Sequence, residues 1–374
     1  MRRGSSKRVK IVSDVHEVAA PAPAAEPEPL DARRETFDLE DRPARVEFEV
    51  ETNYGGWMLA DYVEQKLKRP PERHKLLRLL RGRALVHGEK EPLLPETRIW
   101  PGLKFALRKR FTGDEIEPPP IPIVFDDGAL LVVDKPAGLA LHPTARYFRS
   151  TLTWALAERH RNAAGEKPDP GHRLDRETSG LVACGRTPGD TRALKAAFAA
   201  RTVEKAYVAL CEGSPASDAF EIDRPLSVGT ERIKVKVRVD ESGAASLTSC
   251  RVLARFRDAS GARLSLIRCE PRTGRQHQLR AHLASVGCPL VGDKLYGPDE
   301  GIFLKLAESG SSPAPLFTFD PLLDEGERAR LRLWRHALHA AELAVPHPKT
   351  GERMRFALEL PADIAALIAQ LERL

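Results

Sequence analysis

Cysteine is scarce in this sequence, and its placement argues against a structural role for sulfur. The 374 residues include five cysteines, no two of them spaced C-x-x-C. They are Cys184, Cys211, Cys250, Cys269 and Cys288. Most stand in apolar runs, where a free cysteine behaves as a small hydrophobic side chain. We therefore expect neither a disulfide framework nor a zinc site, and this cysteine usage fits a reducing cytoplasm.

Several other functional patterns are also missing. No stretch approaches the roughly 20 apolar residues of a membrane-spanning helix, and the basic N-terminus lacks the apolar core of a secretory signal. The pairs His277/His282 and His336/His339 do not form an H-E-x-x-H motif, and no glycine-rich loop suits a nucleotide phosphate. We expect no metal, no cofactor and no membrane partner.

Positive charge is present in excess, and it is concentrated in one region. The net charge is +6, with 42% hydrophobic and 30% charged residues. Residues 46–112 contain 14 Lys/Arg and 9 Asp/Glu, a net of +5. This concentration suggests an acidic polymer such as RNA as the partner, although a basic surface that only aids solubility remains an alternative.

The composition changes along the chain and predicts four segments. Residues 1–44 are expected to be a disordered tail, because their Ala/Pro/Glu tract cannot build a core. Residues 46–112 form a small module, and residues 113–122 form a stiff Pro-rich linker. Residues 123–374 form the large domain.

The small module has the pattern of a basic α+β unit. Helices are predicted from Leu59 and over 74–81, followed by a strand at 83–88 and another at 103–107. Its basic helix and the residues after it offer four side chains that can neutralise phosphates: Lys75, Arg78, Arg81 and Arg83. The order of elements resembles a small RNA-binding module shared with a ribosomal small-subunit protein.

The large domain shows more strands than helices. Period-two alternation predicts strands at 233–239, 247–256 and 263–269. Helices are expected over 151–161, 191–201 and 276–286, and Pro361 opens a last one. Strands that do not alternate regularly with helices favour an α+β fold.

One charged loop stands out within this domain. Asp175 lies between Arg173 and Arg176, and Thr178-Ser179-Gly180 follows before an apolar run. Nearby positive charge keeps a carboxylate ionised, and the Thr-Ser-Gly sequence can turn the chain into a buried strand. From the spacing alone, a surface ion pair in a turn is as good an interpretation as a carboxylate in a cleft.

This loop, at 172–180, resembles the signature loop of the RluA-type RNA pseudouridine synthases. Four further blocks agree with that family in the same order along the chain. They are 130–139 with His142-Pro143, 205–210, 272–283 with Gly292-Asp293 and Tyr296-Gly297, and 338–340 with His347-Pro348. The resemblance covers residues 121–373.

The resemblance implies a fold and an activity. The fold is a bent, mostly antiparallel mixed sheet with flanking helices and a central catalytic cleft. The activity is isomerisation of uridine to pseudouridine in RNA by an aspartate without cofactor or metal. The basic module favours ribosomal RNA over transfer RNA, and a monomer is expected. A non-catalytic RNA-binding or ribosome-assembly factor on this fold is the alternative, and a hydrolase pairing Asp175 with Glu177 is a third hypothesis.

The resemblance also assigns roles to individual residues. Asp175 is the catalytic carboxylate, Tyr207 stacks on the uracil, and Arg275 pairs with Asp175. Four further residues are candidates for contact with RNA or with the catalytic loop: His172, Arg173, His277 and Gln278. Lys135 is expected either to contact a phosphate or to be a solvated turn residue.

Overall fold

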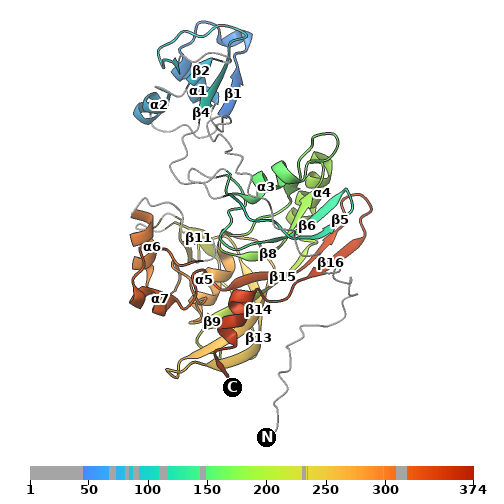
Figure 1. The fold of residues 1–374 in the computed structure, drawn as a ribbon, viewed down its shortest axis with the longest axis vertical. Helices are drawn as coiled ribbons and strands as arrows, with labels where there is room; N and C mark the ends of the chain where they lie inside the picture. The colour runs from blue at the N-terminus through green and yellow to red at the C-terminus, as the bar shows by residue number, and fades with distance from the viewer. Residues whose placement is uncertain are drawn as a thin grey trace, which may run out of the picture. The chain divides into compact units, whose positions relative to one another are not determined.

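The computed structural model describes residues 45–66, 73–80, 84–86, 92–108, 117–143, 149–229, 233, 235–297, 299–308 and 318–374 (Figure 1). The chain separates into two compact units, with the division after Thr112. The predicted tail at 1–44 and residues 113–116 of the predicted linker lie outside the described residues.

The small unit is a four-stranded antiparallel sheet with two helices. Its sheet has the order β1-β4-β2-β3. The elements are β1 (Arg45–Glu49), a 3-10 turn (Thr52–Tyr54), α1 (Leu59–Lys66), α2 (Arg73–Leu80), β2 (Ala84–Val86), β3 (Pro92–Leu93) and β4 (Lys104–Arg108). Tyr62 and Leu76 pack from the two helices against Phe105 of the sheet. Both helices predicted from the sequence are therefore present.

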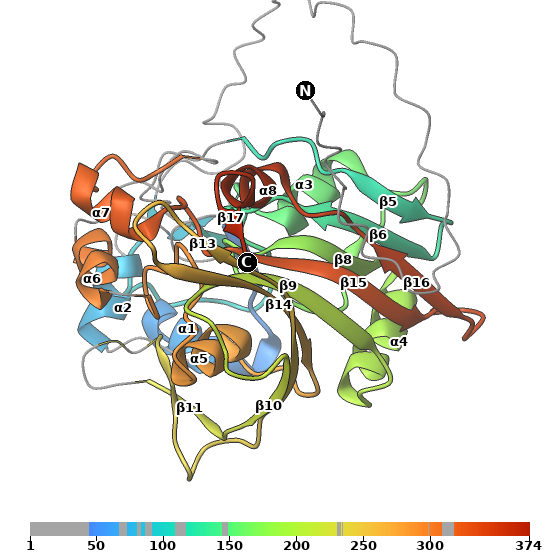
Figure 2. The same cartoon turned by 90° about the horizontal axis from the view of Figure 1, so that it is seen from below.

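The large unit is built on one eleven-stranded sheet (Figure 2). The order is β10-β13-β14-β9-β15-β8-β6-β5, with β16 on β15, β17 on β13 and β7 on β8. Every pair is antiparallel except β15 with β8, which is parallel. The predicted α+β class with a mostly antiparallel mixed sheet is confirmed.

The strands of the large unit have these bounds: β5 (Ile123–Asp126), β6 (Leu130–Lys135), β7 (Asp169–Pro170), β8 (Ser179–Gly185), β9 (Glu204–Glu212), β10 (Ala219–Asp223), β11 (Leu226–Val228), β12 (Val237–Val239), β13 (Leu247–Arg257), β14 (Arg263–Pro271), β15 (Leu338–Pro346), β16 (Arg353–Ala357) and β17 (Glu372–Arg373). Its helices are α3 (Leu152–Arg159), α4 (Pro188–Ala199), α5 (Gln278–Ser285), α6 (Glu300–Glu308), α7 (Glu325–Leu331) and α8 (Ala362–Ile368). None of these helices, nor those of the small unit, has both the length and the apolar run that a bilayer crossing requires.

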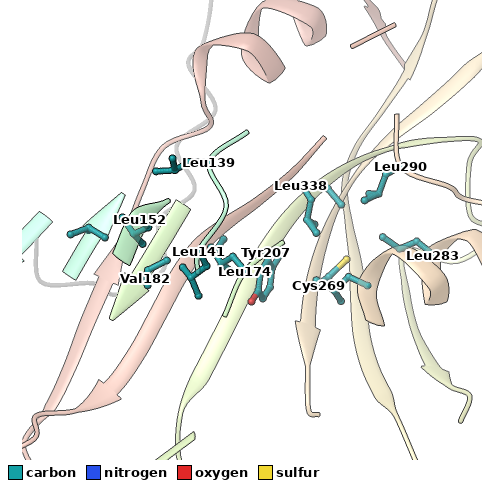
Figure 3. Packing of buried hydrophobic residues seen from close by; sticks show 14 of the residues in the cluster. Leu139, Leu141, Leu152, Leu174, Val182, Tyr207, Cys269, Leu283, Leu290 and Leu338 are labelled. Atoms are coloured by element: carbon teal, nitrogen blue, oxygen red, sulfur yellow. The ribbon is translucent and has the colours of Figure 1, made fainter. Parts of the chain in front are cut away.

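Strand alternation places the helices on both faces of the sheet. Along β9, Tyr207, Ala209 and Cys211 belong to the core cluster that α3 and α5 complete (Figure 3). Val208 and Leu210 point to the opposite cluster, where α8 packs. Tyr207 is therefore on the same face of the sheet as α5, and all five cysteines are buried as free thiols.

Two predicted elements differ from the structure. The strand predicted at 233–239 is wrong in extent, because only Val237–Val239 is a strand, paired with β11. Ile233 instead packs beside Tyr296, and the Lys236 N–H donates to its carbonyl in a turn. The helix predicted from Thr191 begins earlier, at Pro188, because Thr187 and Asp190 form a capping box.

Candidate active site

Asp175 lies in the loop between β7 and β8, facing the helix α5. Its Oδ2 accepts a hydrogen bond from Arg280 Nη1 at 3.2 Å. The same guanidinium donates to both oxygens of Asp293, at 2.7 and 2.9 Å. Burial alone would raise the pKa of Asp175, but the charge and hydrogen bond of Arg280, together with the nearby His277 and His336, outweigh burial, and the pKa lies below its ordinary value. The carboxylate is therefore ionised.

The expected pairing of Asp175 with Arg275 is wrong. Arg275 is exposed, and its Nε donates to the Ala245 carbonyl at 3.4 Å. It stands in the loop before α5, whereas Arg280 is inside the helix on its buried face. Sequence reasoning missed Arg280 although it lies within the matched block at 272–283, because nothing in the spacing distinguishes one arginine of that block from another.

Tyr207 shares the neighbourhood of Asp175. Its ring belongs to the same core cluster as Leu174, which directly precedes Asp175, and Figure 3 shows both side chains. Burial, and then the charge of Asp175, raises the pKa of Tyr207 far above its ordinary value. The phenol is therefore protonated, with its ring at the wall of the cleft.

The cleft is a groove of about 1080 Å³ that runs across β9 and β15 past Tyr207. Basic side chains outnumber acidic ones along it. The basic residues are Arg173, Arg201, Lys205, Arg268, Arg272, Arg275, Arg353 and Arg355, and the acidic ones are Glu204, Glu270 and Glu342. Arg173 is exposed at this groove, in the loop of Asp175. Such a lining is complementary to a polyanion.

A buried shell fixes the loop that carries Asp175. Both Glu177 oxygens accept from Lys294 Nζ, at 3.0 and 3.1 Å. Burial opposes ionisation of Glu177, but the charge and hydrogen bonds of Lys294, together with Arg176 and His336, outweigh it and lower the pKa well below the ordinary value. The fully buried Arg335 donates to the Glu177 carbonyl at 3.3 Å and pairs with Asp363 of α8 at 2.7 and 2.9 Å.

Lys135 belongs to this shell, so both expectations for it are wrong. The side chain is fully buried. Its Nζ donates to the carbonyls of Pro136, Leu139 and Arg176 at 2.8, 2.9 and 3.0 Å. Lys135 therefore ties the loop after β6 to the residue next to Asp175, and its amine has no path to a phosphate.

Two of the residues predicted to contact RNA are engaged within the protein. His172 Nε2 accepts from the Ala183 N–H at 3.1 Å, and the ring stacks on Phe198. Gln278 is buried, and its amide bonds Thr273, Arg275 and Leu247. Gln278 therefore braces the loop before α5. His277, at the N-cap of α5, faces Asp175.

The remaining predicted residues lie in the small unit. Lys75 and Arg78 belong to α2, but the structure does not describe their side chains. Arg81 and Arg83 lie outside the described residues. Over the part of the chain that the structure describes, no cluster of His, Cys, Asp or Glu could hold a metal ion. The paired histidines have other partners: His336 bonds Thr178 at 2.8 Å and His339 bonds Ser179 at 2.9 Å.

Comparison with known proteins gives consistent matches. A family model described as RNA pseudouridylate synthase matches residues 129–285. A ribosomal large subunit pseudouridine synthase D of Zymomonas mobilis is 33% identical over 67% of this chain and 73% of that protein. The protein of the same name from Pseudomonas aeruginosa is 33% identical over 90% and 97%. The solved structure of human RNA pseudouridylate synthase domain containing 1 covers 69% of this chain and 91% of that chain, at 24% identity and a TM-score of 0.52, so the fold is shared.

Proposed function

The chain belongs to the RluA-type RNA pseudouridine synthases, and from that premise we propose that it isomerises uridines of ribosomal RNA with Asp175 as the catalytic carboxylate. The observation that carries this assignment is the ionised Asp175, held by Arg280 in the neighbourhood of Tyr207. A ribosomal substrate is supported by the names of the similar proteins. From such a substrate we infer a cytoplasmic location, and we propose a monomer, since one chain supplies every group named.

The reaction is balanced within the substrate. The bond from uracil N1 to the ribose C1′ breaks, a bond from C5 to C1′ forms, and the proton that leaves C5 is replaced by one on N1. Asp175 can attack the sugar or base as a nucleophile, or can remove a proton from the sugar. In either case its negative charge is required, and Arg280 maintains it.

Tyr207 and the groove hold the RNA. The Tyr207 ring stacks on the detached uracil, an interaction worth roughly 1–3 kcal/mol per base. A uridine must first leave its stack, which costs a few kcal/mol. Arg173, exposed beside the catalytic loop, is placed to bind a phosphate or to fill the vacated space.

The two alternative functions have less support. A non-catalytic factor would not need an ionised carboxylate next to a buried tyrosine, and the similar proteins carry the names of enzymes. A hydrolase acting through Asp175 and Glu177 would need two available carboxyl groups. Glu177 is instead occupied by Lys294.

Mapping pseudouridines across total cellular RNA, with and without this gene, tests the substrate. We expect at least one uridine of large-subunit ribosomal RNA to lose its modification in the deletion strain and to regain it on complementation with the wild-type gene. Complementation with the Asp175→Asn gene is the control and should not restore it. If the lost sites lie in transfer RNA alone, the ribosomal assignment is wrong.

The small unit contributes to RNA affinity in this proposal. Changing Lys75, Arg78, Arg81 and Arg83 together to glutamine should weaken RNA binding and flatten its dependence on salt, by roughly 0.9 in log–log slope per lost phosphate contact. The measurement is the dissociation constant at several salt concentrations. The control changes Lys66 and Lys104, which are paired with Glu51 and Glu49 in the same unit. An unaltered slope in the fourfold variant would remove the RNA role of α2.

A further inference from the structure

His277 adopts an unusual backbone conformation next to Asp175. It is one of three non-glycine residues with positive φ in the described ranges, at 51°, in the left-handed region. Residues with a side chain seldom adopt this conformation, and asparagine and aspartate tolerate it best. A strained residue beside the candidate catalytic carboxylate suggests a function that requires its position.

The partners of His277 define which ring nitrogen carries the proton. Tyr296 Oη accepts from the Val237 N–H at 2.7 Å and lies 3.1 Å from His277 Nδ1. With the phenol proton assigned to the bond with Nδ1, the neutral ring carries its hydrogen on Nε2. Burial, followed by the charge of Arg280, lowers the pKa of His277 to about 4 and keeps the ring neutral.

The Nε2 atom of His277 faces the Asp175 carboxylate across a gap. The distance from Nε2 to Oδ2 is 3.9 Å, too long for a hydrogen bond. Within the described residues, Nε2 has no hydrogen-bond partner. The two side chains retain 14% and 19% of their exposed surface, so both are partly open to solvent. A single oxygen atom can lie within hydrogen-bond distance of both groups.

The two groups on either side of the gap determine which substrate group can bind between them. His277 Nε2 offers a donor and Asp175 an acceptor, so an atom between them must both accept and donate a proton. Among the groups of a uridine nucleotide a hydroxyl does this, whereas the carbonyl and N–H groups of uracil each do only one. Within an RNA chain the 3′ and 5′ oxygens of ribose are esterified to phosphate, which leaves the 2′-hydroxyl.

We propose that His277 Nε2 and Asp175 together bind the 2′-hydroxyl of the target nucleotide, and so make the site selective for RNA over DNA. The inference rests on the proposed function, in which Asp175 meets the reacting ribose. The 2′-hydroxyl is the group by which proteins distinguish RNA from DNA. His277 is then a substrate-binding residue, and Tyr296 positions it.

A double comparison of enzyme and substrate tests this proposal. Full-length wild-type and His277→Asn enzymes are assayed on synthetic stem-loops that carry the mapped uridine as ribonucleotide or as 2′-deoxynucleotide. Asparagine tolerates the left-handed backbone but does not reach the gap. We expect the 2′-deoxy change to lower kcat/KM of the wild type at least tenfold, on the order expected when a hydrogen-bonding site loses its partner. In His277→Asn the 2′-deoxy change should lower kcat/KM by less than about threefold.

Two further variants complete the design. His160→Asn makes the same chemical change at the C-cap of α3 and should keep the full 2′-deoxy penalty. Tyr296→Phe should reduce the penalty in part, because the ring of His277 loses the donor that fixes its tautomer.

Each failure of the test has a separate meaning. Equal 2′-deoxy penalties in wild type and His277→Asn overturn the proposal. If the wild type converts the 2′-deoxy substrate as fast as the ribose substrate, the proposal is also wrong. This outcome needs no variant, so it holds even if His277→Asn fails to fold. A wild-type enzyme that leaves the all-ribose RNA unmodified instead refutes the proposed function, and the present inference with it.

Discussion

The Asp175→Asn enzyme is expected to form no measurable pseudouridine, with turnover reduced at least about a thousandfold. Asparagine keeps the shape of the side chain but loses the negative charge that either role of the carboxylate requires. The fold should persist, because Arg280 retains its two bonds to Asp293. RNA binding should persist as well, since the groove and its basic side chains are unchanged.

Three measurements on one preparation check this result. Pseudouridine formed per enzyme gives the turnover, thermal unfolding gives the stability, and RNA titration gives the affinity, which should stay within about threefold of the wild type. The release of free uracil by the wild type is measured as well. Near-normal turnover in Asp175→Asn would refute the assignment of the carboxylate, and stoichiometric uracil release would identify a hydrolase.

Replacing Arg280 with methionine is expected to have the largest effect on stability. The Asp293 side chain has no exposed surface, and the substitution would leave its carboxylate buried without a counter-ion, with the backbone N–H groups of Leu295 and Tyr296 as its remaining donors. Breaking a buried ion pair in this way costs about 3–5 kcal/mol of unfolding free energy. Turnover should be lost too, because Asp175 loses the charge that keeps it ionised.

The loss of unfolding free energy in Arg280→Met should become smaller as the pH falls. In the wild type, burial opposes ionisation of Asp293, but the charge and hydrogen bonds of Arg280, with His336 and the Tyr296 N–H, together outweigh burial, so the pKa of Asp293 is well below the ordinary value. Asp293 therefore stabilises the fold above its unfolded pKa, and that contribution is lost as the pH falls. Without Arg280, burial raises the pKa of Asp293, so acid favours the folded variant relative to neutral pH. The difference in stability between the two proteins should shrink from pH 7 to pH 4.

Urea unfolding at several pH values measures the difference, and Arg275→Met is the matched control. Arg275 is exposed, and its only side-chain hydrogen bond among the described residues reaches a backbone carbonyl. Its replacement should change the unfolding free energy by less than about 0.5 kcal/mol. A greater loss in Arg275→Met than in Arg280→Met would contradict the pairing seen here.

The catalytic loop could be predicted from the sequence, but the buried residues that hold it in place could not. Tyr207 of β9 does lie in the neighbourhood of the loop residue Asp175, and the α+β sheet is as expected from its strand patterns. The choice of Arg275 over Arg280 failed because helix boundaries decide which arginine faces inward, and spacing alone does not fix them. Lys135 could not be predicted either, because its three acceptors are backbone carbonyls, which no side-chain pattern reveals.

The strand predicted at 233–239 shows a related limit. Alternation identifies residues that could lie on two faces of a sheet, but pairing needs a neighbour of matching length. Here β11 offers only Leu226–Val228, so the pairing ends at Val237. The partner of a strand is a property of the whole fold and is absent from the local pattern.

One contact of the catalytic loop can form only after the C-terminal part of the chain has been synthesised, and that contact is made by Arg335. This one guanidinium joins the Glu177 carbonyl to Asp363 of α8. When Asp175 has been synthesised, neither Arg335 nor Asp363 exists yet. The ribosome must first translate the half of the message that lies between Asp175 and Asp363. The loop of Asp175 therefore gains this tie only after Asp363 has been synthesised, later than Arg280, the direct partner of the carboxylate.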